Sequence, residues 1–157
     1  MAKIVSQAEL IKIRRTLKRR GKKVVFTNGC FDIIHRGHVE YLAKAKRLGD
    51  VLIVALNTDS SVRKLKGKGR PITGLADRAY VMAHLDMVDY VTSFGSETPQ
   101  AIIAKLLPDY LVKGGDYKRD DIVGAKEVRA AGGKVVVIPF VKGRSSTRMI
   151  KRLRGMN

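Results

Sequence analysis

Short strand-like runs of apolar residues alternate along the chain with segments in which apolar residues recur at helical spacing. The predicted strands are 24–27, 51–56, 89–92, 110–112 and 135–138. The predicted helices are 6–21, 39–48, 76–85, 98–106, 122–131 and 146–154. The run Val-Leu-Ile-Val-Ala-Leu at 51–56 is typical of a parallel strand covered on both faces. The alternation predicts βαβ units, and therefore an α/β fold with a doubly wound, Rossmann-like parallel sheet.

Local signals mark several helix boundaries. Ser6 and Glu9 have the spacing of a capping box, which begins the first helix. Thr98 is expected to be an N-cap, with the following proline in the first helical turn. At 157 residues we expect one domain, 1–157, with a basic N-terminal helix within 1–22 packed on it.

In open parallel sheets, ligands bind beyond the carboxyl ends of the strands. The loops that follow the predicted strands should therefore form the functional site. These loops are 28–38, 57–71, 113–117 and 139–147. Three of them are rich in glycine, lysine or arginine, which are residues that suit phosphate groups.

The loop 28–38 contains two histidines three residues apart, His35 and His38, with Gly37 between them. At the beginning of a helix this spacing puts both imidazoles on one face, where unpaired N–H groups and the helix dipole attract anions. A packed core histidine and a zinc site that also uses Cys30 and Asp32 are the alternatives. The strand-to-helix context favours phosphate binding.

The net charge of the chain is +18, from 32 basic and 14 acidic residues. The segments 3–23, 63–70 and 142–154 hold 20 of the basic residues. Such a charge attracts polyanions, which include nucleic acid, an anionic membrane surface and a small phosphorylated substrate. For 3–23 we favour an ordinary solvated surface. Aromatic residues are only 6% and do not interleave with the basic runs, which argues against an RRM-like RNA-binding surface.

The sequence lacks the features of membrane-spanning, secreted and disulfide-bonded proteins. No apolar run approaches the ~20 residues of a transmembrane helix, and the N-terminus has no apolar core of a signal peptide. A single cysteine, Cys30, excludes an internal disulfide framework. We therefore expect a cytoplasmic protein, in which Cys30 is a small packing residue and not a nucleophile.

Two motifs resemble those of a known family. The segment 29–38 is similar to the G-x-F-D-x-x-H-x-G-H signature of the cytidylyltransferase-like nucleotidyltransferase superfamily, and 145–150 is similar to its late S-[ST]-T-x-x-I motif. They stand in the expected order, more than 100 residues apart. The segments 65–71 and 107–117 resemble the heptose 1-phosphate adenylyltransferases that make ADP-heptose for lipopolysaccharide. Without a kinase half, the chain resembles the stand-alone form of these enzymes.

The resemblance implies that a phosphate oxygen of the acceptor attacks the α-phosphorus of ATP, with Mg²⁺ as cofactor and pyrophosphate as leaving group. It implies small-molecule substrates, a homodimer, no membrane and no specific nucleic acid as partners. Related enzymes use CTP with glycerol phosphate or another small acceptor, which is the alternative within the family. A basic RNA-binding module is the alternative from another class.

We assign candidate roles on this basis. The catalytic candidates are His35, His38 and Lys66, and the acceptor-binding candidates are Asn57, Asp59 and Arg70. The nucleotide-binding candidates are Gly29, Cys30, Phe31, Asp32, Gly37, Arg78, Lys113, Gly115, Asp116, Ser146 and Thr147.

Some of these residues have a more specific expected role, and three of these roles have an alternative. Lys66, Arg70 and Arg78 are expected to clamp phosphates. Asp32 either binds Mg²⁺ or accepts backbone hydrogen bonds. The hydroxyls of Ser146 and Thr147 either cap the last helix, which we favour, or bind phosphate. Residues 114–116 either contact substrate or only form a turn.

Overall fold

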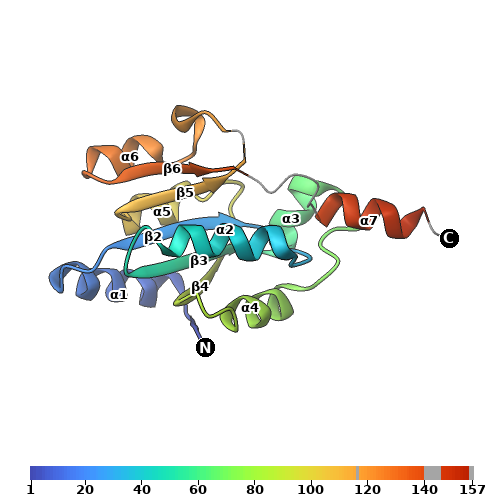
Figure 1. Cartoon of the computed structure of the whole chain (residues 1–157), viewed down its shortest axis with the longest axis horizontal. Coiled ribbons are helices and arrows are strands. Elements are labelled where there is room, and N and C mark those ends of the chain that lie inside the picture. The colour runs from blue at the N-terminus through green and yellow to red at the C-terminus, as the bar shows by residue number, and fades with distance from the viewer. Residues whose placement is uncertain (116, 140–145, 156–157) are drawn as a thin grey trace.

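The computed structural model describes residues 1–115, 117–139 and 146–155. In chain order its elements are β1 (Lys3–Ile4), α1 (Gln7–Arg19), β2 (Val24–Gly29), α2 (Arg36–Lys46), β3 (Val51–Asn57), α3 (Asp59–Lys66), α4 (Leu75–Ala83), β4 (Tyr90–Phe94), α5 (Gln100–Leu106), β5 (Tyr110–Gly114), the 3₁₀ helix η1 (Arg119–Asp121), α6 (Ala125–Ala130), β6 (Lys134–Ile138) and α7 (Ser146–Arg154). The strands form one sheet in the order β1-β4-β3-β2-β5-β6, and each neighbouring pair is parallel (Figure 1). The predicted parallel α/β fold is confirmed.

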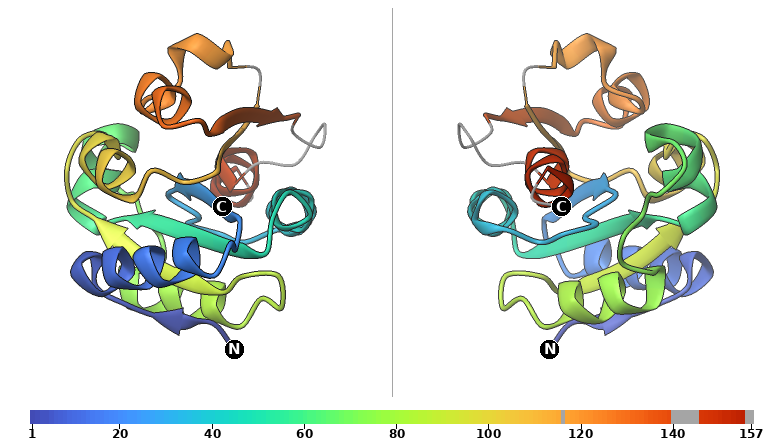
Figure 2. Two further views of the ribbon diagram at one scale, coloured as in Figure 1. Left: turned by 90° about the vertical axis from the view of Figure 1, so that its left-hand side faces the viewer. Right: turned by 90° about the vertical axis from the view of Figure 1, so that its right-hand side faces the viewer.

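Helices cover both faces of the sheet, as a doubly wound sheet requires (Figure 2). Along β3 the fully buried side chains alternate, so that Leu52 and Val54 pack on one face and Ile53 and Ala55 on the other. Helices α2 and α4 complete the first core, and α1, α5 and α6 complete the second. The continuous apolar run of β3 follows from this two-sided burial.

The strand order reverses beside β2. From β2 the chain adds β3 and β4 on one side, and it later adds β5 and β6 on the other. Ligands of open α/β sheets bind at the carboxyl ends of the strands where the order reverses. The topology therefore directs attention to the loops after β2 and β5, with the loop after β3 alongside.

Helix α1 packs on the sheet through Leu10, which is fully buried, and through Arg14. The guanidinium of Arg14 forms an ion pair with Asp109 at 3.1 Å and donates to the carbonyl of Leu106 at the end of α5. Asp109 also accepts a hydrogen bond from the amide of Val24 at 2.8 Å. These contacts fasten the amino ends of β2 and β5, far along the strands from the predicted site.

Several expected boundaries were wrong. Helix α3 occupies part of the 57–71 segment that was expected to be a loop, because Thr58 caps it and its single buried apolar residue, Val62, gives no helical pattern. The N-cap of α5 is Pro99 and not Thr98. Strand β1 has only two residues, too few for a sequence pattern, and pairs with β4 at the edge.

The last part of the chain also differs from expectation. The predicted helix 122–131 is shortened to α6, because Gly124 stands before it as the N-cap with a φ of 84° and Ala131 is its C-cap. The 3₁₀ helix η1 lies just before the predicted range. None of the helices within the described ranges is long and apolar enough to cross a membrane.

Candidate functional site

The two histidines of the signature stack against each other where β2 leads into α2. His35 is the N-cap residue of α2 with extended backbone, and His38 lies in the first turn. Their ring centroids are 3.9 Å apart, with 20° between the ring planes. The spacing in the sequence thus puts both imidazoles on one face at the positive end of a helix, as expected.

His38 is held in an environment that keeps it neutral. Burial, together with the neighbouring His35, lowers the pKa of His38 to about 4. The ring of Phe31 lies against it, with centroids 5.2 Å apart. Within the part of the chain that the structure describes, the buried Nδ1 of His38 has no hydrogen-bond partner. At neutral pH this ring is an uncharged imidazole that can donate one hydrogen bond to a ligand.

Asp32 is fully engaged by protein partners. Its side chain is 0% exposed and forms an ion pair with Nε of Arg70 at 2.6 Å. The amides of Ile72 and Thr73 donate to it at 2.8 and 2.9 Å. Burial alone would raise the pKa of Asp32, but the bonds from Thr73, Ile72 and Arg70 hold it below its usual range. Arg70, expected to bind the acceptor, is instead the counter-ion of Asp32.

This engagement does not fit a metal ligand. Both carboxylate oxygens of Asp32 accept hydrogen bonds inside the protein, so no oxygen is presented to a cation. Within the described ranges, no cluster of three or more His, Cys, Asp or Glu residues is arranged to hold a metal ion. The backbone alternative for Asp32 accounts for its contacts, and the zinc alternative receives no support.

Arg78 joins three segments and is not free to clamp phosphate. Its side chain is 1% exposed, and Nη2 contacts Asp59 at 2.6 Å. It also donates to the carbonyls of Cys30 at 2.7 Å, Asn57 at 2.9 Å and Thr73 at 3.0 Å. The expectation of a phosphate clamp is corrected, because these bonds commit four of the five N–H donors of the guanidinium. Arg78 fixes the ends of β2 and β3 to the start of α4.

The acceptor candidates after β3 are turned inward. Asn57 is 4% exposed, and its Nδ2 donates to the hydroxyl of Ser61 at 2.9 Å. Asp59 pairs with Arg78 and is 36% exposed at the side chain. The side chain of Asn57 therefore shapes the loop, which corrects the expectation that it faces the acceptor. Asp59 keeps an exposed edge.

Two lysines approach the loop that carries the signature motif, residues 29–38 (the signature loop), from either side of β2. Lys66 is exposed at the end of α3, and its charge acts on the thiol of Cys30. Lys113, near the end of β5, donates from Nζ to the side-chain oxygen of Asn28 at 3.2 Å. Burial raises the pKa of the Cys30 thiol, and the positive charge of Lys66 opposes this increase only in part. The thiol is therefore protonated and suits packing.

The late motif is brought to the same loop. The hydroxyl of Ser146 donates to the carbonyl of Ile33 at 2.9 Å, although the two residues are 113 positions apart. The Ser146 hydroxyl therefore joins α7 to the signature loop instead of capping its own helix, while Thr147 is exposed. Figure 1 shows α7 at the end of the sheet where α3 lies. The motif's first serine, Ser145, lies outside the described residues.

The remaining candidates are placed as follows. Gly29 ends β2, and Gly37 is buried in the first turn of α2. Gly115 has a φ of 112° and donates its amide to the carbonyl of Ile138 at 3.0 Å, which fits the turn alternative. Asp116 lies outside the described residues. Asn28 was not predicted, and only the pairing of β2 with β5 reveals that it meets Lys113.

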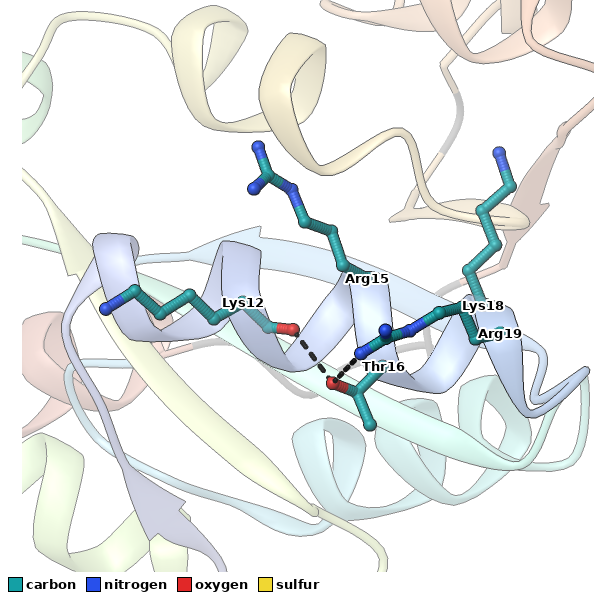
Figure 3. Close-up of a pocket in the computed structure, with 5 residues that line it drawn as sticks. All are labelled: Lys12, Arg15, Thr16, Lys18 and Arg19. Carbon is teal, nitrogen blue, oxygen red and sulfur yellow. Dashed lines mark hydrogen bonds between the residues drawn. The ribbon is translucent and has the colours of Figure 1, made fainter.

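A shallow pocket of about 580 Å³ lies elsewhere, along α1 (Figure 3). It is lined by Lys12, Arg15, Thr16, Lys18 and Arg19, and no candidate site residue takes part. The helix covers the face of the sheet opposite α2. The basic N-terminal segment therefore forms a surface separate from the histidine pair.

Residues 26–152 match the family described as Cytidylyltransferase-like. The "Bifunctional protein HldE" of Actinobacillus succinogenes is 52% identical over 153 residues, which are 98% of this chain and 32% of that protein. The protein of the same name from Vibrio cholerae is 53% identical, over 97% of this chain and 32% of that protein. The chain thus spans about a third of the length of the curated relatives it matches.

Two solved structures are similar to this one. The lipopolysaccharide core biosynthesis protein from Thermoplasma volcanium has a TM-score of 0.65 and 30% identity, over 79% of this chain and 100% of that one. A pantoate-beta-alanine ligase from Francisella tularensis has a TM-score of 0.63 and 16% identity, over 98% of this chain and 77% of that one. The second likeness shows the fold alone.

Proposed function

The chain belongs to the Cytidylyltransferase-like family and is a nucleotidyltransferase, and on this premise we propose that it transfers AMP from ATP to a heptose 1-phosphate, forming ADP-heptose and pyrophosphate. The observation that carries the proposal is the stacked pair His35 and His38 at the beginning of α2. The heptose is supported by the resemblance at 65–71 and 107–117 and by the relatives named HldE.

The reaction needs positioning more than covalent chemistry. A phosphate oxygen of the acceptor attacks the α-phosphorus of ATP and forms a new P–O bond. The bond from the α-phosphorus to the bridging oxygen breaks, and pyrophosphate leaves with the electron pair. Negative charge builds on the leaving group, so fixed hydrogen-bond donors and positive charges nearby lower the barrier.

The chain supplies such groups around the signature loop. The first turn of α2 presents amide N–H groups and the positive end of its dipole to the phosphates. His35 and His38 donate hydrogen bonds beside it, and Lys66 adds an exposed positive charge from α3. Mg²⁺ is expected to accompany the ATP phosphates, and we assign no step to it because Asp32 is already occupied.

Pyrophosphate release tests the proposal directly. The purified protein is incubated with Mg²⁺, each nucleoside triphosphate in turn, and a panel of heptose, hexose and glycerol phosphates. We expect release with ATP and a heptose 1-phosphate. Release only with CTP and glycerol phosphate would favour the alternative within the family. No release with any pair, together with tight RNA binding at physiological salt, would favour the RNA-binding alternative.

Assembly and location follow as separate proposals. We propose a homodimer, which light scattering coupled to size-exclusion chromatography would detect as a mass of about twice 17.4 kDa. A cytoplasmic location is expected of an enzyme that consumes ATP, and cell fractionation tests it. Neither proposal affects the chemistry assigned to the site.

A further inference from the structure

The buried cations of this protein differ in whether they have a counter-ion. Three arginines with nearly buried side chains each have a carboxylate partner: Arg14 with Asp109, Arg70 with Asp32 and Arg78 with Asp59. Lys113 is partly buried and, among the described residues, has no carboxylate within ion-pair distance. Its Nζ contacts the amide oxygen of Asn28 at 3.2 Å and lies 6.0 Å from the ring centroid of Tyr117.

The position of Lys113 is that of a ligand-binding residue. It is the second-last residue of β5, and β5 pairs with β2 at the point where the strand order reverses. Electrostatic interactions couple the thiol of Cys30 to Lys66 and to Lys113. Two lysines therefore lie near the signature loop, Lys66 at the end of helix α3 and Lys113 in strand β5, and the histidine pair ends this loop.

Withdrawal of an ammonium group from water without a carboxylate disfavours its charged form. Burial lowers the pKa of Lys113 accordingly. An amide oxygen satisfies one hydrogen bond but supplies no negative charge. A protein that keeps such a lysine gains from it only when an anion arrives, because the anion restores the missing charge.

We propose that Lys113 binds a phosphoryl group of the substrates, which supply its counter-ion, and that Asn28 holds the amine in place beforehand. The inference rests on the proposed function for the identity of the phosphoryl group, which belongs either to ATP or to the acceptor. The chemistry of recognition is the same for both sources, so the experiment separates them.

Calorimetric titrations with ATP, with inorganic tripolyphosphate and with heptose 1-phosphate compare the wild type with Lys113→Met. Lys126→Met is the matched control, since it removes one exposed lysine of α6 and lowers the net charge equally. We expect Lys113→Met to weaken binding of at least one of these ligands by about 10- to 100-fold, the value of a hydrogen bond between charged groups. Lys113→Arg should recover part of this loss, and the control should differ little from wild type.

The ligand that is affected identifies the source. A loss with both ATP and tripolyphosphate assigns Lys113 to the nucleotide phosphates, and a loss with heptose 1-phosphate alone assigns it to the acceptor. Equal losses of affinity in Lys113→Met and Lys126→Met would show that the lysine acts only through general electrostatic attraction. This result would overturn the proposal. Unchanged affinity for all three ligands would also overturn it.

The stability of the free protein gives an independent readout. Because the ammonium has no carboxylate partner among the residues that the structure describes, Lys113→Met should raise the midpoint of thermal unfolding by roughly 2 to 4 °C without ligand. A fall of the midpoint would instead assign the amine a structural role and contradict the proposal. The pKa of the Lys113 amine, followed by NMR of labelled lysine, should rise when the phosphoryl ligand binds.

These measurements do not depend on turnover. If the wild type releases no pyrophosphate with heptose 1-phosphate, the proposed function fails, while the tripolyphosphate and ATP titrations still decide the role of Lys113. If turnover is normal in Lys113→Met and its affinities equal those of the control, the further inference fails and the proposed function stands.

Discussion

The imidazole of His35 stacks on that of His38 at a centroid distance of 3.9 Å, so a proton on one ring opposes a proton on the other. Burial adds to this effect at His38, whose pKa falls to about 4. His38 therefore offers a neutral donor to a phosphate at physiological pH. A bound triphosphate would raise the pKa of His38 by its negative charge.

His38 should make the folded protein less stable in mild acid. Its pKa is lower in the folded state than the usual 6.5, so the unfolded state binds the extra proton. The contribution of neutral His38 to the free energy of unfolding is fully present above about pH 6.5 and is lost as the pH falls toward 4. We expect this loss to be about 1 to 2 kcal/mol after discounting for the partial exposure of the ring. Urea unfolding of wild type and His38→Gln between pH 4 and 7 measures it, and a variant with an unchanged pH slope would contradict it.

His38 should also contribute to the rate. Replacement by alanine removes a fixed donor to the charge that builds on pyrophosphate, which is worth about 10²- to 10³-fold in kcat/KM. His84→Ala is the matched control, because His84 is exposed at the end of α4 and contacts Tyr80. Steady-state pyrophosphate release compares the two. Similar rates for both variants would remove His38 from the mechanism.

Replacement of Arg78 should lower the stability of the folded protein more than it weakens ATP binding. Arg78→Met leaves the buried carbonyls of Cys30 and Asn57 without a donor and Asp59 without its counter-ion, which should cost about 3 to 5 kcal/mol of unfolding free energy. Arg78→Lys should recover only part, because one amine cannot reach all four acceptors. Urea denaturation measures both variants. A stable Arg78→Met protein with a raised KM for ATP would restore the phosphate-clamp assignment.

Asp32 provides a test of the metal alternative. Asp32→Asn should destabilise the protein, because the negative charge opposite Arg70 is lost and one of its oxygens becomes an amide. The Mg²⁺ concentration that gives half-maximal rate should stay unchanged, since both carboxylate oxygens already accept hydrogen bonds. Rates titrated with Mg²⁺ decide this. An increase of tenfold or more in the required Mg²⁺ would show that Asp32 reaches the metal.

Asp32 also makes the stability of the wild type depend on pH, through a carboxylate instead of an imidazole. The folded pKa of this carboxylate lies below its usual value, so its stabilising contribution is present above about pH 4 and is lost as the pH falls further. In Asp32→Asn this acid-induced loss should be smaller. Unfolding curves below pH 4 provide the comparison with wild type.

The fold and the arrangement of the histidine pair could be predicted because they depend on local patterns. Alternation of apolar strands and amphipathic helices is enough to indicate a parallel sheet, and spacing alone put His35 and His38 on one face. Ser146 followed from its motif, although not its partner Ile33. These features require no knowledge of which strands are neighbours.

The roles of the charged residues could not be predicted in the same way. Arginines in a basic loop suit phosphate by their chemistry, but the carboxylates opposite Arg70 and Arg78 stand 38 and 19 positions away. Only folding shows that those acids are close enough to take the positive charge. The pairing of Lys113 with Asn28, 85 positions apart, was hidden for the same reason.

Two charged side chains connect the signature loop to α4 and to the segment before it: Asp32, which belongs to the loop, and Arg78, which belongs to α4. Asp32 in the loop accepts hydrogen bonds from 70–73. Arg78 in α4 donates a hydrogen bond to the carbonyl of Cys30 in the loop. Neither contact can open alone without leaving a buried charge unpaired. The amides of Ile72 and Thr73, which donate to Asp32, should therefore exchange with solvent slowly, because their exchange requires both of these contacts to open.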